Sequence, residues 1–238
     1  HLSLRRQRQM CIRDRYGVTF DASEINGFMN IGESDLLLKP DPSTAEILPW
    51  RPQQDRVLRI FCDICYPDGR TFEGDSRNIL KRSVDCLKEL GYSCDIGSEC
   101  KFYLFELDEY GNPTNKPHDN GTYYDVAPVD KGENIRREIC LTLEEMGIQP
   151  ESSYHQAGPG QHEIVFKYGA PVEAADHLMT FKNLVKTIAH MNGLFASFMP
   201  KPLQRQNGNG IPMTNIATKK LLKCLNQRKR VFRLEALQ

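Results

Sequence analysis

The sequence has no excess of charge of either sign and no long apolar run. Its 31 basic and 31 acidic residues cancel, so no overall electrostatic field attracts nucleic acid or an anionic membrane. No apolar stretch approaches the roughly 18 residues that a membrane-spanning helix needs. No apolar segment follows the basic N-terminus, as it would in a secretory signal. We therefore expect a cytoplasmic protein with no nucleic acid or membrane as a partner.

The chain also lacks the paired cysteine motifs of a zinc site. Its eight cysteines are scattered through apolar patterns, which is typical of small buried hydrophobic residues in intracellular proteins. Cys62 and Cys65 have the spacing of half a zinc site, but no second such pair and no histidine pair completes it. On a strand these two side chains would also point to opposite faces. The pattern disfavours zinc.

Neither end of the chain has the pattern of a folded domain. Residues 1–15 are basic and non-periodic, and they contain QMCIRDR, which matches a translated sequencing adapter. We interpret them as a non-native segment rather than as part of the fold. Residues 212–238 end in a short basic stretch, and we interpret them as an aberrant tail produced by a broken reading frame.

Apolar periodicity predicts three helices in the remaining chain. The first begins with Asp75 as its N-cap and ends before a glycine. The second lies within 130–147 and starts with a capping box formed by Asp130 and Glu133. The third spans 173–192, with its apolar side chains at helical spacing.

Alternating apolar and polar residues predict strands over 57–69 and 98–113, and a third strand that begins near Glu163. The Pro-rich segment 38–52 is predicted to be a loop. Helices and strands alternate, but hairpin turns also occur, so the fold class is α+β with a largely antiparallel sheet. A boundary at 69–75 separates a small N-terminal unit from a larger one.

Glu99 and Glu163 each begin a predicted strand. Carboxylates on adjoining strands are a common way to hold a divalent cation beside nucleotide phosphates. For either glutamate alone, a solvated acid at a strand end is the better interpretation. His155 and His162 flank the same region, and we interpret them as hydrogen-bonded histidines rather than ligands.

Six motifs occur in order between residues 16 and 211: "FDASEINGF", "ESDLLLKPDPST", "ILPWRP", "DVAPVDKGENIRREI", "GPGQHEI" and "FMPKP". In order, spacing and identity they resemble type I glutamine synthetase. The resemblance implies a small, incomplete β-grasp domain over 16–70. It also implies the first part of an antiparallel-sheet-plus-helices catalytic domain over 75–211, from the N-terminal part of a longer reading frame.

The activity that the resemblance implies is ATP-dependent ligation of ammonia to L-glutamate through γ-glutamyl phosphate, with Mg²⁺ or Mn²⁺ as the metal. The implied partners are glutamate, ammonium, ATP and further copies of the chain in a homo-dodecamer. The fragment by itself is not expected to make glutamine.

The family's functional positions can be located in this sequence. Glu99 and Glu163 match metal ligands, and Glu151 matches a position that touches the nucleotide. Asp21 and Tyr123 match the pair that binds and deprotonates ammonium, with Asp21 reaching into a neighbouring subunit. The loop that holds the glutamate substrate corresponds to Asn207 and Gly208.

Three further metal positions carry other residues here. Lys101 replaces the second glutamate of the Glu-x-Glu pair, and its ammonium is expected to repel a divalent ion and to pair with Glu99. Gln156 replaces a glutamate, keeping an oxygen ligand but losing the charge. Pro212 replaces a histidine and cannot ligate. Binding of the metal and ATP is therefore expected to be weakened or lost.

Two other interpretations remain open. One is a catalytically degenerate paralogue that binds glutamate or nucleotide and acts as a regulator, which Lys101 and Gln156 favour. The other is a γ-glutamyl ligase that uses an amine in place of ammonia, because the charge that attracts ammonium is missing at Gln156.

Overall fold

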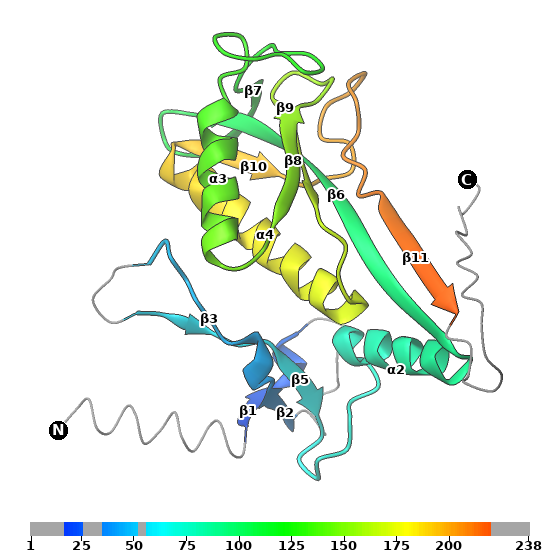
Figure 1. The fold of residues 1–238 in the computed structure, drawn as a ribbon. Helices are drawn as coiled ribbons and strands as arrows, with labels where there is room; N and C mark the ends of the chain where they lie inside the picture. The colour runs from blue at the N-terminus through cyan, green and yellow to red at the C-terminus, as the bar shows by residue number, and fades with distance from the viewer. Residues whose placement is uncertain (1–16, 26–34, 52–55, 220–238) are drawn as a thin grey trace. The chain divides into compact units, whose positions relative to one another are not determined.

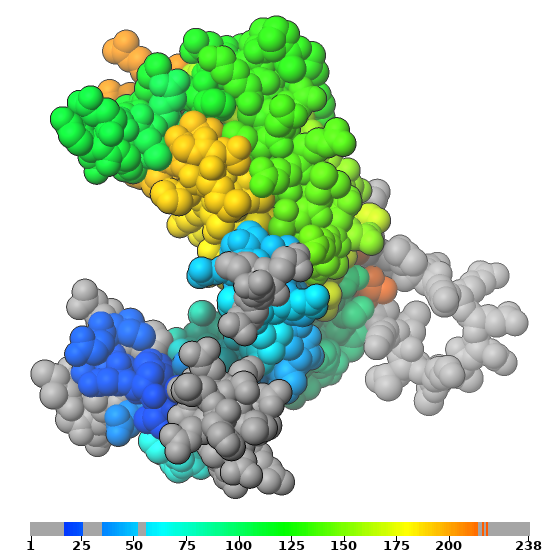
Figure 2. All heavy atoms as spheres, turned by 90° about the vertical axis from the view of Figure 1, so that its left-hand side faces the viewer, coloured from blue at the N-terminus to red at the C-terminus, as the bar shows by residue number. Residues whose placement is uncertain are grey.

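The computed structural model describes residues 17–25, 35–51 and 56–219. The adapter-like segment 1–15 lies outside the described residues. The chain forms two compact units, His1–Leu90 and Gly91–Gln238, which are coloured along the chain in Figures 1 and 2 and are described separately below. None of the helices in the described part of the chain has the length and apolarity to cross a membrane.

In the described residues of the first unit, a three-stranded sheet is accompanied by a separate strand pair and three helical segments. The sheet has the order β1-β2-β5, and its neighbouring strands are antiparallel. The elements are β1 (Val18–Asp21), η1 (Ala22–Glu24), β2 (Asp35–Pro40), η3 (Pro42–Thr44), β3 (Glu46–Ile47), β4 (Leu58–Arg59), β5 (Cys62–Cys65) and α2 (Ser76–Glu89).

The small core of this unit joins the sheet to the chain that leads into α2. Ala22, Leu36 and Phe72 are buried and pack together. Asp75 is the N-cap of α2, as predicted, and its carboxylate accepts a hydrogen bond from Arg77 N at 3.1 Å. The other oxygen of Asp75 accepts from Ile64 N of β5 at 3.1 Å. One capping side chain therefore both starts the helix and fastens it to the sheet.

Two predictions for this region need correction. Segment 57–69 was expected to be one strand, but it is divided into β4 and β5. Residues 38–40 were expected in a loop, but they belong to β2. The reason is tertiary, because β2 lies between β1 and β5 and its backbone groups are paired on both edges, which outweighs the local preference of proline for irregular structure.

The second unit is built around one long strand, β6 (Tyr92–Leu107). The sheet order is β10-β6-β9-β8, and β7 and β11 also pair with β6 (Figure 1). All the strand pairs of the described sheet are antiparallel, which confirms the predicted α+β class. The other strands are β7 (Pro113–Pro117), β8 (Pro150–His155), β9 (Gln161–Phe166), β10 (Leu194–Ser197) and β11 (Met213–Lys219).

Strand β11 falls in the segment that the sequence assigned to an aberrant tail. Residues 213–219 pair with Tyr92–Ser98 of β6. Residues 220–238 lie outside the described part of the chain.

Two helices, α3 (Glu133–Glu145) and α4 (Pro171–Met191), cover one face of the β6-β9-β8 sheet (Figure 1). Phe181 of α4 is fully buried, and its ring lies 4.9 Å from Phe166 and 6.0 Å from Phe102 between centroids. Ile164 shares this face with Phe166, as the alternation in β9 predicted. Glu163 lies on the opposite face of the sheet, away from α3 and α4.

The predicted capping box of α3 is wrong. The N-cap is Gly132, with no side-chain cap. Asp130 Oδ2 instead lies 2.7 Å from Arg136 Nη2 in a buried ion pair. Glu133 accepts a hydrogen bond from Ala127 N at 3.1 Å. The sequence pattern was that of a cap, but Asp130 pairs with the buried guanidinium of Arg136 instead.

Replacing the central aromatic ring of this core tests its contribution to stability. Phe181→Ala is expected to lower the free energy of unfolding by about 3–5 kcal/mol, because it removes contacts with the rings of Phe102, Phe166 and Phe198 and leaves a cavity. Tyr110→Ala is the control, since Tyr110 is 81% exposed and its loss should cost about 0.5 kcal/mol or less. Urea unfolding followed by far-UV circular dichroism measures both. Equal losses would contradict this account of the core.

Candidate active site

The face of the sheet away from α3 and α4 brings the main predicted residues together. In the register of β6 and β9, Lys101 lies opposite Glu163 and Glu99 lies opposite Val165. On the other side of β9, Tyr154 of β8 lies opposite Glu163. Residues opposite one another, and residues two apart on one strand, share a face. Glu99 and Glu163 therefore occupy neighbouring strands on one face, as predicted.

Glu163 is the centre of this face. The residue is 1% exposed, and its Oε2 accepts a hydrogen bond from Gln156 Nε2 at 2.6 Å. Lys101 Nζ lies 3.8 Å from the same oxygen. Burial and a hydrogen bond to Glu163 raise the pKa of Tyr154. The carboxylate thus sits among an amide, an ammonium and a phenol.

The partner of Lys101 differs from the expected one. The ion pair that its ammonium makes in the structure is with Glu163 rather than with Glu99. Strand pairing explains the difference, because directly opposed side chains on neighbouring strands are closer than diagonal ones or those two residues apart on one strand. Side-chain exposure is 21% for Lys101 and 1% for Glu163, so the pair is largely removed from water.

Gln156 also differs from expectation, because its oxygen is directed at the backbone and its NH₂ group at Glu163. Its Oε1 accepts a hydrogen bond from Ala157 N at 2.7 Å, which fixes the orientation of the amide. The NH₂ group must then face Glu163, and the contact at 2.6 Å is a donor–acceptor pair.

Glu99 and Pro212 are adjacent in the structure. Glu99 N donates a hydrogen bond to Pro212 O at 3.1 Å. Pro212 therefore stands beside Glu99. It offers no side-chain donor there.

Three further predicted residues, Tyr123, Asn207 and Gly208, are held in place by contacts with residues of β6, β8 and β9. Tyr123 is 56% exposed, and its ring is perpendicular to that of Tyr154 at 5.9 Å. The Asn207 and Gly208 carbonyls accept hydrogen bonds from Tyr103 and Gln161, at 2.6 and 3.0 Å. Their loop is thereby held against β6 and β9.

Two predicted residues are not brought into these contacts. Glu151 is exposed on β8. Asp21 belongs to the first unit, where it accepts hydrogen bonds from Ser23 N and Oγ at 2.9 and 2.6 Å. Its role in a site shared between subunits stays a prediction.

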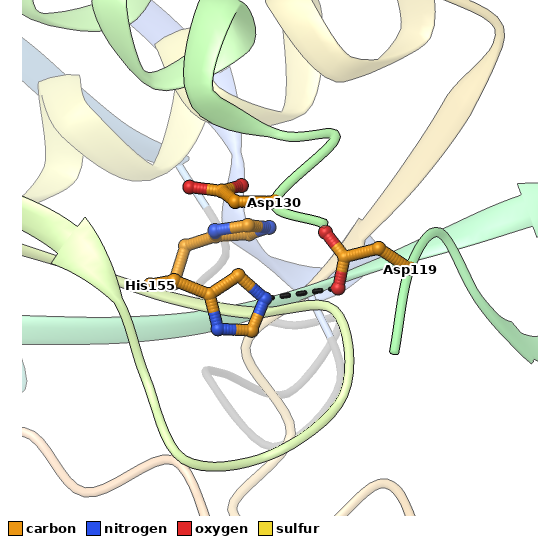
Figure 3. Close-up of side chains that lie close together, drawn as sticks. Asp119, Asp130 and His155 are labelled. Carbon is orange, nitrogen blue, oxygen red and sulfur yellow. Dashed lines mark hydrogen bonds and ion pairs between the residues drawn. The ribbon is translucent and has the colours of Figure 1, made fainter. Parts of the chain in front are cut away.

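A buried cluster of acids and histidines lies on the other face of the same strands, and sequence reasoning did not find it. Asp119, Asp130, His155 and His162 each offer a polar atom, and these atoms lie within 4.8 Å of one another. Figure 3 shows Asp119, Asp130 and His155, with the imidazole of His155 bonded to Asp119. Such a set has the chemistry of a metal site, so its charges need to be counted.

His155 is held as a cation. Its Nδ1 lies 2.6 Å from Gln156 O and its Nε2 lies 2.9 Å from Asp119 Oδ1. Both partners are acceptors, so both ring nitrogens must donate and neither has a lone pair for a metal. Burial opposes the charge, but the hydrogen bond and charge of Asp119 raise the pKa of His155.

Asp119 is held as an anion by the same contacts. It accepts hydrogen bonds from Gly121 N and Gly160 N at 3.1 and 2.8 Å. Although burial acts in the opposite direction, these bonds and that of His155 hold the pKa of Asp119 well below its usual range.

Arg136 balances the second half of the cluster. Its guanidinium lies 2.7 Å from Asp130 Oδ2 and 2.9 Å from His162 Nδ1. Burial and the charge of Arg136 lower the pKa of His162 well below its ordinary value. A Cβ at Gly132 would lie 2.5 Å from His162 Nε2, so glycine is required there.

The cluster is therefore electrically balanced, with two carboxylates, one guanidinium and one imidazolium. It has no excess negative charge to attract a divalent cation. We interpret it as an internal network that holds the turn between β8 and β9, and with it Gln156. The interpretation of His155 and His162 as hydrogen-bonded histidines is confirmed. No sequence pattern linked the two aspartates to these histidines, because Asp119 and Asp130 lie in a loop region far from both histidines in sequence.

Comparison with known families gives two matches. The model of the glutamine synthetase catalytic domain matches residues 73–214. The model of the glutamine synthetase β-grasp domain matches residues 7–67. These confirm the expected pair of domains in the expected order.

Curated relatives are similar over most of this chain. Glutamine synthetase of Clostridium saccharobutylicum is 52% identical over 192 residues, which are 81% of this chain and 43% of that protein. The Methanosarcina mazei enzyme is 49% identical over 195 residues, 82% of this chain and 44% of that protein. The chain thus spans less than half the length of these relatives.

Solved structures share the fold. Ligand-free GmaS matches with a TM-score of 0.80 and 28% identity, over 89% of this chain and 49% of that one. Plasmodium falciparum glutamine synthetase matches with a TM-score of 0.76 and 28% identity, over 87% and 46%.

The balanced cluster predicts a pH dependence of stability. A raised pKa in the folded state means that the contribution of His155 is fully present below its ordinary value of 6.5 and is lost as pH rises through the raised value. Asp119→Asn removes the negative charge that raises the pKa of His155. It should lower the free energy of unfolding by about 3–5 kcal/mol on the acid side of 6.5, and by progressively less at higher pH.

Urea unfolding of the wild type and Asp119→Asn, followed by circular dichroism across the neutral and alkaline range, measures this difference. Asp95→Asn is the control, since Asp95 is exposed on β6. A difference between wild type and Asp119→Asn that stays constant with pH would show that His155 is not held as a cation.

Proposed function

The chain belongs to the glutamine synthetase family, and we propose that the protein of which it is a part joins ammonia to glutamate with ATP. In this proposal residues 16–70 belong to the β-grasp domain and 75–211 to the first part of the catalytic domain. The family matches over 7–67 and 73–214 support this division. The 238-residue chain lacks more than half of the relatives' length and is not expected to turn over by itself.

The chemistry proposed for the site has two steps. A carboxylate is a poor electrophile, so the γ-carboxylate of glutamate first attacks the γ-phosphorus of ATP, giving γ-glutamyl phosphate and ADP. Ammonia, formed when ammonium gives one proton to a base, then attacks the acyl carbon; phosphate leaves, and the nitrogen loses one further proton to give the amide. Ammonium must therefore be bound and deprotonated next to the acyl phosphate.

The observation that carries the proposal is the cluster of family positions on one face of the sheet. Glu163 lies beside Tyr154, whose ring contacts Tyr123. We propose that Tyr123 and Asp21 bind ammonium and that Glu151 contacts the nucleotide. Asn207 and Gly208, on a loop held by Tyr103 and Gln161, would position the glutamate substrate.

The divalent metal of the family does not fit the residues at Glu163. The carboxylate is already opposed by the ammonium of Lys101 and bonded to the NH₂ of Gln156. Pro212 offers no donor beside Glu99. We therefore assign no step of the reaction to a metal ion at this position.

A second candidate follows from the same contacts. A paralogue that binds glutamate or nucleotide without turnover would also keep the fold and the substrate loop while losing the metal. The Lys101–Glu163–Gln156 contacts favour this candidate. The loss of charge at Gln156 also allows an amine in place of ammonia as the acceptor.

Assembly and cellular location follow as proposals from family membership. We propose a homo-oligomer, a dodecamer in the complete protein, in which Asp21 of one subunit serves the site of its neighbour. We propose a cytoplasmic location, where ATP and glutamate are available.

Turnover by the complete protein tests the two candidates. With glutamate, ammonium, ATP and Mg²⁺, we expect slow release of ADP and formation of glutamine. Lys101→Glu combined with Gln156→Glu should raise the rate by about 10²-fold, the order of a restored electrostatic stabiliser of the transition state. Mass spectrometry of the amide product and an ADP assay measure it, with methylamine as a parallel acceptor.

Different results would separate the candidates. Product with methylamine but not with ammonium would identify an amine ligase. Absence of product with either acceptor, together with calorimetric binding of glutamate or ADP, would contradict ligase activity and support the regulatory paralogue.

A further inference from the structure

We propose that the ammonium of Lys101 and the amide of Gln156 form an internal counterion that takes the place of a divalent metal ion at Glu163. The site made by these three residues is then closed to Mg²⁺ and Mn²⁺. The inference rests on the proposed function, which assigns Glu163 to a metal position of the family.

The first step is the burial of the carboxylate. Glu163 is 1% exposed, and an ionised carboxylate removed from water needs a cation or several donors. Gln156 Nε2 supplies a donor at 2.6 Å and Lys101 Nζ a positive charge at 3.8 Å. Tyr154 lies directly opposite Glu163 in the register of β8 and β9. These groups come from this chain alone and supply what a bound metal would otherwise supply.

The second step is the position of the positive charge. The register of β6 and β9 sets Lys101 directly opposite Glu163, so the ammonium is placed by backbone pairing rather than by a flexible surface contact. A magnesium ion would lie roughly 2 Å from a carboxylate oxygen. It would therefore lie within a few ångströms of the ammonium, in a place where little water screens their repulsion.

The third step is the direction of the amide. Ala157 N donates to Gln156 Oε1 at 2.7 Å, so that oxygen is directed at the backbone and the NH₂ group at Glu163. The NH₂ group that faces Glu163 has hydrogen atoms and no lone pair to offer a metal. Gln156 therefore blocks the site as well as lacking the charge.

The fourth step is the number of ligands that remain. In the described part of the chain, Glu163 Oε1 is a buried atom without a hydrogen-bond partner. One such oxygen is far short of the near-octahedral set that Mg²⁺ demands. It does mark the place where a metal would gain a ligand if Lys101 and Gln156 were carboxylates.

Manganese binding to the 238-residue chain tests the proposal without turnover. The electron paramagnetic resonance signal of free Mn²⁺ reports the number of ions bound. Wild type and Glu163→Gln should bind the same number. Lys101→Glu with Gln156→Glu should bind one further ion, which adding Glu163→Gln should remove.

A matched control separates the site from overall charge. Lys186→Glu with Gln204→Glu makes the same change in net charge at two exposed positions, and it should not create a manganese site that depends on Glu163. Fewer bound ions in Glu163→Gln than in wild type would overturn the proposal. So would a double reversion that binds no further ion while keeping the wild-type circular dichroism spectrum.

A second measurement decides the matter if the double reversion does not fold. Lys101→Met keeps the length of the side chain but removes the charge, so its thermal midpoint should fall, and Lys101→Arg should restore it. Mn²⁺ should leave the midpoints of wild type and Lys101→Met unchanged, because Gln156 still faces the carboxylate in both proteins. A metal-dependent rise in wild type that Glu163→Gln abolishes would overturn the proposal. Neither measurement uses turnover, so an inactive protein with these results would contradict only the proposed function.

Discussion

The antiparallel register of β6 and β9 is the constraint on which the candidate site depends. It sets Lys101 opposite Glu163 and leaves Glu99 diagonal to it. A shift of one residue would exchange the two faces of β9 and put Glu163 against the helices. The aromatic contacts of Phe166 and Phe102 with Phe181 resist such a shift. The hydrophobic core therefore holds a polar site in register on the opposite face.

A second requirement is that charge be balanced wherever it is buried. On the helix-covered face, the carboxylates of Asp119 and Asp130 are matched by His155 and Arg136. On the site face, Glu163 is matched by Lys101. In the described residues each arrangement leaves a buried polar atom without a hydrogen-bond partner, His162 Nε2 in the first and Glu163 Oε1 in the second.

Family membership implies a divalent metal ion, whereas the residues around Glu163 do not fit one. About half of the matched residues are identical to those of the curated relatives, and the loop of Asn207 and Gly208 is held in place by Tyr103 and Gln161. At three positions that the proposed function assigns to the metal, this chain carries Lys101, Gln156 and Pro212. A fold can be kept while one site changes, because core packing and site chemistry lie on opposite faces of the same strands.

Sequence periodicity alone determined the helices, the α+β class and the alternation within β9, because local spacing of apolar residues decides which face of an element is buried. The resemblance located Glu99 and Glu163 and the three replaced positions. Only tertiary structure decided how polar groups pair. Lys101 pairs with Glu163 rather than with Glu99, and the oxygen of Gln156 accepts from Ala157 N. Asp130 pairs with Arg136 and is not the helix cap. Lys101 and Glu163 come from strands distant in sequence, and even the partners that lie close along the chain are chosen by three-dimensional proximity, which no one-dimensional pattern records.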